Sequence, residues 1–371
     1  MNESKDRAGK PRRTQSRVRG MMLGLAIGET VGAARGALPA SGPLRAGVGT
    51  QLACFTAEGI IRAMVRMSHK GICHPPSVVL HAYCRWAALQ GIEVERMRRR
   101  WASVKDESAW PDGWLAEVPA LAERRGSAPA TVAALSRIEG TDVPTPTTSR
   151  GCHALTRSLP LAAVDVELAR QAGDFAALTH GDPAAQSATA QAAVLAHHCL
   201  TSTAPAADPG SGSDRAVRRA MDAGLATLST LREHASGEEH ERLVTAYRLG
   251  VDQPAHTPTL AHLAPYPTAP SALLGALYTA SSFPGRTQLR TALHFAAQAP
   301  DGASVACVTG ALLGAVHGYE ALPVDLVSRH ELSWVLDTLA RDLLSELNDS
   351  PSGSEYVGGW DPYWWGRYPG W

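Results

Sequence analysis

Four short segments place small residues beside polar side chains at points where helices are expected to begin. They are residues 47–52, 149–153, 179–183 and 300–304, which read GVGTQL, SRGCH, THGDP and PDGAS. Backbone N–H groups in the first turn of a helix have no partner within the helix, and they favour an anion. Each segment could therefore bind a ligand, with Thr50, His180 or Asp301 contributing a side chain. The alternative is structural, because Thr50, Asp182 and Asp301 are also good caps for the helices that follow.

Cysteine and histidine residues form neither a nucleophile pair nor a zinc pattern. Cys152 and His153 are neighbours, and adjacent residues of a helix point in different directions. The six cysteines include no C-x-x-C pair, and the fourteen histidines include no H-x-x-x-H pattern. We therefore expect no disulfide framework and no zinc site, and a reducing cytoplasm is the expected location.

Composition excludes several classes of protein. The 371 residues include 35 basic and 35 acidic side chains, and this neutrality argues against a nucleic-acid-binding protein. Residues 1–19 lack the apolar core of a signal peptide, and the apolar run 21–34 is too short to span a bilayer. We expect a soluble protein with no membrane span and no nucleic-acid partner.

Apolar residues recur at intervals of three or four along the chain, which is typical of amphipathic helices. No stretch of alternating apolar and polar residues is long enough to indicate a strand. Residues 303–318, rich in Ala and Gly, are expected to form a buried helix. Residues 214–250 and 324–347 are each expected to form one amphipathic helix. The sequence predicts an all-α fold.

The chain is expected to have one domain with two appended segments. Residues 1–17 are basic and lack apolar periodicity, so we expect a disordered arm. Residues 18–347 would form a single compact helical domain. Residues 348–371 would form a Trp-rich tail that either folds back over a groove or presents its aromatic rings to a partner.

The order and content of these segments resemble the ADP-ribosylglycohydrolase family, including its dinitrogenase-reductase-activating type. Its opening G-x-x-x-G-D-A-L-G helix is similar to residues 19–32, in which Glu29 replaces the aspartate. Further counterparts of its motifs follow in order at residues 50–63, 149–153 (S-K-G-C-G), 177–181 (A-L-T-H-G), 301–304 (D-x-D-S/T) and 309–314 (I-T-G-x-L-x-G). The resemblance extends over residues 17–345, which makes it more specific than any single motif.

The resemblance implies a compact all-α bundle that hydrolyses the N- or O-glycosidic bond between ADP-ribose and a protein side chain or small acceptor. In the family, two Mg²⁺ ions lie at the base of the pocket, held by an S/T-D-D triplet and by the D-x-D-S/T segment. By the same resemblance, ADP-ribose or a related nucleotide would contact Glu29, Gly151, Cys152, His153 and His180.

The sequence departs from the family at the metal ligands. The S/T-D-D-T positions are occupied by Gly47, Val48, Gly49 and Thr50, and the D-x-D-S/T positions by Asp301, Gly302, Ala303 and Ser304. Only Asp301 remains of four aspartates, and it is the one residual catalytic candidate. Mg²⁺ requires oxygen ligands in near-octahedral geometry. No cofactor is therefore expected, with weak Mg²⁺ binding by Thr50, Asp301 and Ser304 as the residual option.

Three functions are compatible with this pattern. The first is a catalytically degenerate relative that binds ADP-ribose, a related nucleotide or a protein partner in a regulatory role. The second is an active (ADP-ribosyl)-protein hydrolase with a reduced magnesium site, in which Glu29 and Glu58 join Asp301. Glu58 lies about two helical turns beyond Thr50, which favours helix packing or the surface instead. The third is a structural or interaction module with a vestigial pocket.

Overall fold

The structure is a computed structural model that describes residues 3–92, 110–138, 146–202, 212–231 and 236–370. Residues 1–2 of the expected arm, the side chains of residues 3–13 and the last residue of the tail, Trp371, lie outside this part.

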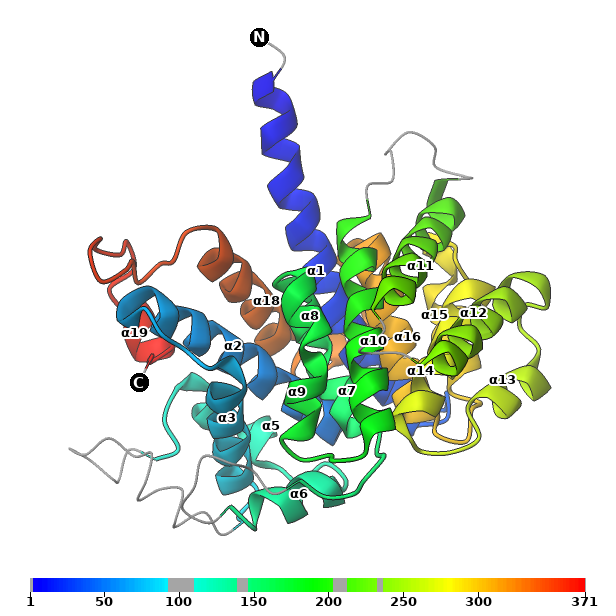
Figure 1. Cartoon of the computed structure of the whole chain (residues 1–371), viewed down its shortest axis with the longest axis horizontal. Coiled ribbons are helices and arrows are strands. Elements are labelled where there is room, and N and C mark those ends of the chain that lie inside the picture. Colours follow the sequence, from blue (N-terminus) through cyan, green and yellow to red (C-terminus); the bar gives the residue numbers. More distant parts are fainter. Residues whose placement is uncertain (1–2, 93–109, 139–145, 203–211, 232–235, 371) are drawn as a thin grey trace.

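The elements of this part are helices, joined by turns and by isolated β-bridges (Figure 1). The α-helices are α1 (Glu3–Ala33), α2 (Val48–Lys70), α3 (Pro75–Leu89), α5 (Pro119–Ala122), α6 (Pro129–Leu135), α7 (His153–Ser158), α8 (Val166–Arg170), α9 (Ala172–Ala177), α10 (Pro183–Thr201), α11 (Gly212–Thr230), α12 (Gly237–Asp252), α13 (Thr257–Leu263), α14 (Ala269–Ser282), α15 (Leu289–Ala296), α16 (Gly302–His317), α17 (Val324–Arg329), α18 (Ser333–Asn348) and α19 (Trp364–Arg367). Short 3-10 helices are η2 (Trp114–Glu117), η3 (Leu159–Ala163), η4 (Arg286–Gln288) and η5 (Tyr319–Ala321). The predicted all-α fold is confirmed. No described helix is long and apolar enough to cross a membrane.

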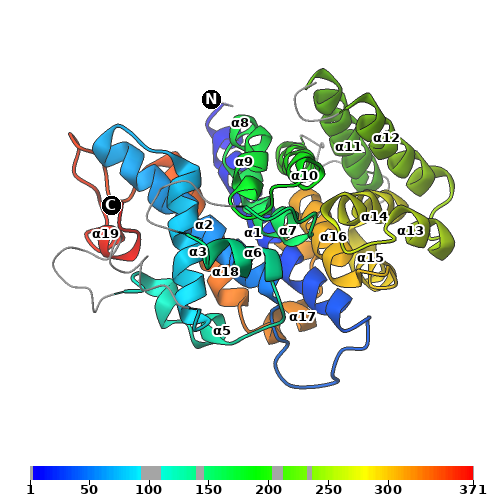
Figure 2. The ribbon, with the colours of Figure 1, turned by 60° about the horizontal axis from the view of Figure 1, so that its bottom comes forward.

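Helices α1 and α16 form an antiparallel pair at the centre of the fold (Figure 2). Four glycines of α1, spaced four residues apart between positions 20 and 32, lie along one helix face. A Cβ atom at Gly24 would lie 2.2 Å from the carbonyl oxygen of Gly310, and one at Gly310 would lie 2.1 Å from that of Gly24. The two backbones are therefore in direct contact, which fixes the position of each helix against the other.

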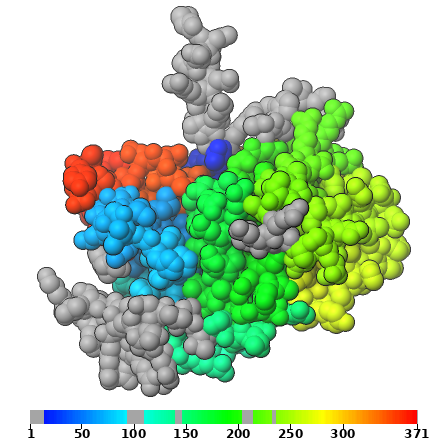
Figure 3. Space-filling model, viewed as in Figure 1, coloured from blue at the N-terminus to red at the C-terminus, as the bar shows by residue number. Residues whose placement is uncertain are grey.

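Two groups of helices flank this central pair. Helix α2 packs against α3, α7 and α18, whereas α14 packs against α12 and α16. In the space-filling view, α2, α3 and the C-terminal tail meet at one end of the molecule, and α12 and α13 lie at the opposite end (Figure 3). The segments that carry the candidate site lie between these groups, at the N-terminal ends of α2, α7 and α16.

The expected helix over residues 303–318 is confirmed as α16, but two other expected helices are each divided. Residues 214–250 form α11 and α12, because Ser236 starts α12 with a capping box in which its hydroxyl and the Glu239 carboxylate each accept the other residue's N–H. Residues 324–347 form α17 and α18, because the backbone between them pairs with Leu44 at N···O distances of 2.8 and 3.0 Å. Predicting one helix in each range was wrong.

At the N-terminus, the structure continues α1 back to Glu3, where a disordered arm over residues 1–17 was expected. Val18 is already buried against the core. Once a helix is nucleated by packing, adding residues to its end is inexpensive in free energy. This explains how a polar segment without apolar periodicity can be helical.

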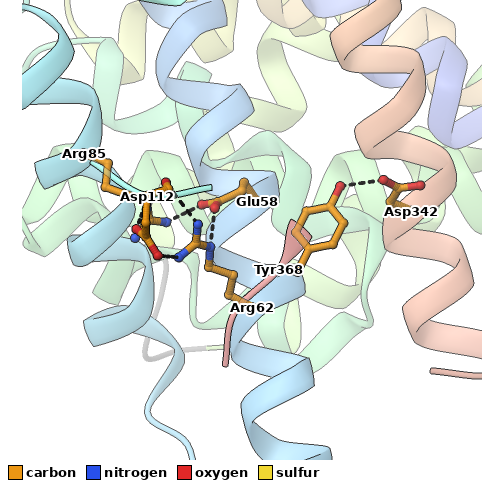
Figure 4. Close-up of polar contacts among 6 residues, drawn as sticks. All are labelled: Glu58, Arg62, Arg85, Asp112, Asp342 and Tyr368. Carbon is orange, nitrogen blue, oxygen red and sulfur yellow. Dashed lines mark hydrogen bonds and ion pairs between the residues drawn. The ribbon is translucent and has the colours of Figure 1, made fainter. Parts of the chain in front are cut away.

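The Trp-rich tail folds back between α2 and α18. Trp364 is buried, and its Nε1 donates a hydrogen bond to Glu346 Oε2 of α18 at 2.9 Å. The hydroxyl of Tyr368, also buried, donates to Asp342 Oδ2 at 2.6 Å (Figure 4). These two rings anchor the tail, while other aromatic side chains of the tail remain exposed, namely Tyr356, Trp360 and Tyr363.

Candidate functional site

The carboxylate of Glu29, on α1, caps the N-terminus of α2. Its Oε1 accepts the backbone N–H of Gly49 at 2.9 Å, and its Oε2 accepts the backbone N–H of Thr50 at 2.8 Å and the Thr50 hydroxyl at 2.5 Å. Glu29 is only 7% exposed and Thr50 is fully buried. A negative charge at this end of a helix is favourable because of the free N–H groups and the helix dipole. Both carboxylate oxygens are thus engaged within the protein.

Glycine at positions 47 and 49 leaves room for this carboxylate. A Cβ atom at Gly47 would lie 2.4 Å from Glu29 Cδ, and one at Gly49 would lie 2.8 Å from Glu29 Oε1. The Cβ at Gly49 would also lie 3.1 Å from the hydroxyl oxygen of Thr156. Any side chain at these two positions would therefore require Glu29 to move.

Asp301 caps α16 at the other side of the cluster. Its Oδ1 accepts the backbone N–H of Ser304 at 3.4 Å, whereas its Oδ2 is buried without a hydrogen-bond partner. The thiol of Cys152, just before α7, lies beside Asp301 and Ser304. Burial and the negative charge of Asp301 raise the pKa of Cys152 to about 12. At neutral pH this group is a thiol and not a nucleophilic thiolate.

The two histidines of the site are neutral at neutral pH. Burial lowers the pKa of His153, although the carboxylates of Glu29 and Asp301 act in the opposite direction. Burial, reinforced by the positive charge of Arg157, lowers the pKa of His180 to about 2. His180 Nδ1 shares a 2.8 Å hydrogen bond with a neighbouring threonine hydroxyl. These imidazoles can therefore act as hydrogen-bonding groups but not as resident cations.

The structure brings most of the predicted site residues together. Glu29 and Asp301 both lie within electrostatic range of His153, and the residues around them are Thr50, Cys152 and Ser304. His180 lies behind Gly151, where a Cβ atom would be 3.3 Å from His180 Nε2.

Thr156 also belongs to this cluster, although it is not among the predicted site residues. It is 2% exposed and its hydroxyl oxygen is buried without a hydrogen-bond partner. It lies four residues after Cys152, one helical turn away on the same face, which is the signal that could have identified it. The described residues include no group of three or more His, Cys, Asp or Glu side chains arranged to hold a metal ion.

Glu58 lies elsewhere, in a buried ion-pair cluster with Arg62, Arg85 and Asp112 (Figure 4). It is 1% exposed and pairs with both arginines. Asp112 pairs with Arg62 at 2.9 Å and with Arg85 at 3.7 Å. The predicted packing role is confirmed and the surface alternative is wrong, because α3 and the segment before η2 cover this face of α2. Glu58 is engaged here and does not join Asp301.

Two hollows adjoin the candidate site. One, of about 580 Å³, is lined by Arg150 and Thr268 next to Gly151, and extends over α10, α12, α13 and α14. The other, of about 510 Å³, lies beside Gly47 and is lined by residues that include Arg45, Arg124 and Arg125. The β-bridge between Gly151 and Thr268 places the wall of the first hollow next to residues 149–153.

Comparison with known proteins identifies one family. A sequence model of the family described as ADP-ribosylglycohydrolase matches residues 10–352. A solved structure entitled "ADP-ribosylglycohydrolase-related protein complex" is similar to this chain with a TM-score of 0.55 and 22% sequence identity, covering 91% of this chain and 99% of that chain. At this identity the likeness shows the fold alone. No curated protein sequence gives a significant match.

Proposed function

Because the chain belongs to the ADP-ribosylglycohydrolase family, we propose that it is a catalytically degenerate member, a pseudoenzyme that binds ADP-ribose or a related nucleotide in a regulatory role. One observation carries the proposal: Val48, Gly49 and Ala303 stand where the family pattern has aspartates. The remaining aspartate, Asp301, uses one carboxylate oxygen to cap α16.

The residues present do not fit the family's two magnesium ions. Mg²⁺ prefers about six oxygen ligands in octahedral geometry. Both oxygens of Glu29 already accept hydrogen bonds from α2, which leaves Asp301 Oδ2 as the uncommitted carboxylate oxygen of this cluster. A single carboxylate oxygen with neighbouring hydroxyls cannot balance two divalent charges. We therefore assign no hydrolytic step to a metal in this chain.

Nucleotide binding is supported by the hollow at Arg150. Its volume of about 580 Å³ lies within the range of small-molecule sites. The Arg150 side chain is 63% exposed and is oriented by Asp182 at 2.9 Å, so its guanidinium can meet a phosphate at the rim. Gly151, without a side chain, allows the backbone to approach a ligand closely.

Calorimetric titration of the full chain with ADP-ribose, with and without a chelator, tests this proposal. We expect saturable binding that the chelator does not change. Arg150→Ala is expected to weaken it, whereas Arg290→Ala, which removes another exposed arginine paired with an aspartate, is expected to leave it unchanged. Absence of binding in the wild-type chain would contradict the proposal.

The same samples test the alternative of an active hydrolase. The buried, unpartnered Oδ2 of Asp301 is the observation that favours it, since this oxygen could ligate a single Mg²⁺ bridged by a ligand's phosphates. We expect no release of ADP-ribose from ADP-ribosylated arginine or serine peptides when Mg²⁺ is added. Release that depends on Mg²⁺ and is lost in Asp301→Asn would replace the proposed function with this alternative.

A further inference from the structure

The N-terminus of α2 is occupied by a side chain of the protein itself. We propose that Glu29 is an internal ligand of this helix terminus and determines what the base of the site accepts. It keeps phosphate and carboxylate groups of a ligand away from the terminus, and it keeps side chains out of positions 47 and 49. The inference rests on the proposed function only in taking this cluster as the base of the family's site.

The hydrogen-bond donors at the start of α2 are already used within the protein. The free N–H groups at the start of a long helix attract anions. Here the N–H groups of Gly49 and Thr50 and the Thr50 hydroxyl all donate to Glu29. A phosphate could reach these donors only by displacing a buried carboxylate that already satisfies them.

The backbone that carries Glu29 is fixed in position by the packing of α1. In the sequence, Glu29 lies between Gly28 and Gly32. A Cβ atom at either glycine would lie 2.1 Å from a carbonyl oxygen of α16. Backbone contact between α1 and α16 thus fixes the part of α1 that carries Glu29. The Glu29 carboxylate therefore extends toward α2 from a helix whose backbone is in direct contact with that of α16.

The side chain of Glu29 also restricts positions 47 and 49 sterically. Glu29 has one methylene more than the aspartate of the family pattern, and its carboxylate fills the space in which Cβ atoms at Gly47 and Gly49 would stand. Loss of the aspartate at position 49 and gain of the longer acid at position 29 are therefore one coupled change. Restoring an aspartate at position 49 alone would force two carboxylates into one space.

The consequence concerns the chemical group that the base can receive. The buried side-chain oxygen atoms of the cluster that have no hydrogen-bond partner are Asp301 Oδ2 and the Thr156 hydroxyl oxygen. The carboxylate oxygen accepts a hydrogen bond, and the threonine hydroxyl can accept or donate one, so the base suits a neutral group such as a hydroxyl, which does both. The anionic part of a nucleotide would have to bind away from this base, in the hollow lined by Arg150.

A double-mutant cycle read by thermal unfolding tests the coupling. Gly49→Ala is expected to lower the melting temperature in the wild-type chain, and to lower it much less in the Glu29→Ala background. Gly59→Ala is the matched control, because its Cβ would meet Val79 of α3, 3.0 Å away, and not Glu29. Its effect should be equal in both backgrounds. Equal effects of Gly49→Ala in the two backgrounds would overturn the inference.

Titration with inorganic phosphate tests the exclusion of anions. We expect the wild-type chain to show no saturable binding at this site and Glu29→Ala to gain binding that Arg150→Ala does not remove. If Glu29→Ala does not fold, Glu29→Ser, which also removes the carboxylate and leaves the space at the helix terminus open, replaces it. Equal phosphate affinity with and without the Glu29 carboxylate would refute the exclusion. Failure of ADP-ribose to bind would instead refute the proposed function and leave the coupling result unaffected.

Discussion

Two buried glutamates of this protein are stabilised in different ways. Glu58 on α2 pairs with Arg62 and Arg85, and Asp112 completes a cluster of two acids and two bases. Glu29 on α1 is held by two main-chain N–H groups and a hydroxyl of α2. The first arrangement balances charge with charge, so removing one member leaves others unpaired. In the second arrangement, the N–H groups at the N-terminus of a helix bind the carboxylate. The carboxylate therefore takes the place of any other anion that this terminus would attract.

The largest expected effect is on the charge-paired region. Glu58→Gln should lower the free energy of unfolding by about 3–5 kcal/mol, because it leaves two buried arginines with a single acid. Urea unfolding followed by circular dichroism measures this difference. Glu355→Gln, an exposed glutamate in the tail, is the control and should change stability by less than about 0.5 kcal/mol. A loss for Glu58→Gln no larger than this control would show that the cluster is not structural.

A smaller effect is expected at Glu29. Glu29→Gln should lower the free energy of unfolding by about 1.5–3 kcal/mol, because it weakens hydrogen bonds to a charged acceptor. Thr50→Val removes only the hydroxyl donor and should lower it by about 1 kcal/mol. If Glu29→Gln destabilised the chain as much as Glu58→Gln does, the contrast between the two regions would fail.

The two regions should also respond to acid in different pH ranges. The pKa of His180 is lowered to about 2, so the unfolded chain binds a proton below about pH 6.5 that the folded chain does not. Stability conferred by neutral His180 is complete above pH 6.5 and decreases as the pH falls. His180→Asn should therefore reduce the slope of stability between pH 6 and 4 by about 1.4 kcal/mol per pH unit.

Asp112 provides the contrasting case. Burial would raise its pKa, but the charges of Arg62 and Arg85 outweigh burial and lower it. The stability that ionised Asp112 contributes is fully present above its unfolded-state pKa of about 3.9. It is lost only as the pH falls below that value. Asp112→Asn should leave the slope of the free energy of unfolding against pH unchanged between pH 6 and 4. Urea unfolding at a series of pH values gives both slopes, and equal changes in the two variants would contradict this assignment.

Much of the fold could be predicted from the sequence because its signals are local. The spacing of apolar residues indicated helices, and the Ala/Gly-rich composition of residues 303–318 identified the buried α16. The breaks at Ser236 and before α18 were missed. A capping box inside a charged stretch and pairing with Leu44, far away in sequence, interrupt a continuous apolar pattern.

The candidate site could be predicted only in part. The order of motifs identified most of its members, and the resemblance predicted that Val48, Gly49 and Ala303 stand at aspartate positions of the family pattern. The order of motifs could not show that Glu29 fills the space beside Gly47 and Gly49, because this contact depends on how α1 and α2 cross. The partners of Glu58 were missed for the same reason, because Arg85 and Asp112 come from other segments.

Calorimetric titration of Mg²⁺ into the full chain tests whether this cluster can still hold the two ions of the family. We expect no saturable uptake of two ions, because Glu29 is committed to α2 and Asp301 Oδ2 is the uncommitted carboxylate oxygen of this cluster. Saturable binding of two Mg²⁺ ions per chain that is lost in Asp301→Asn would contradict it.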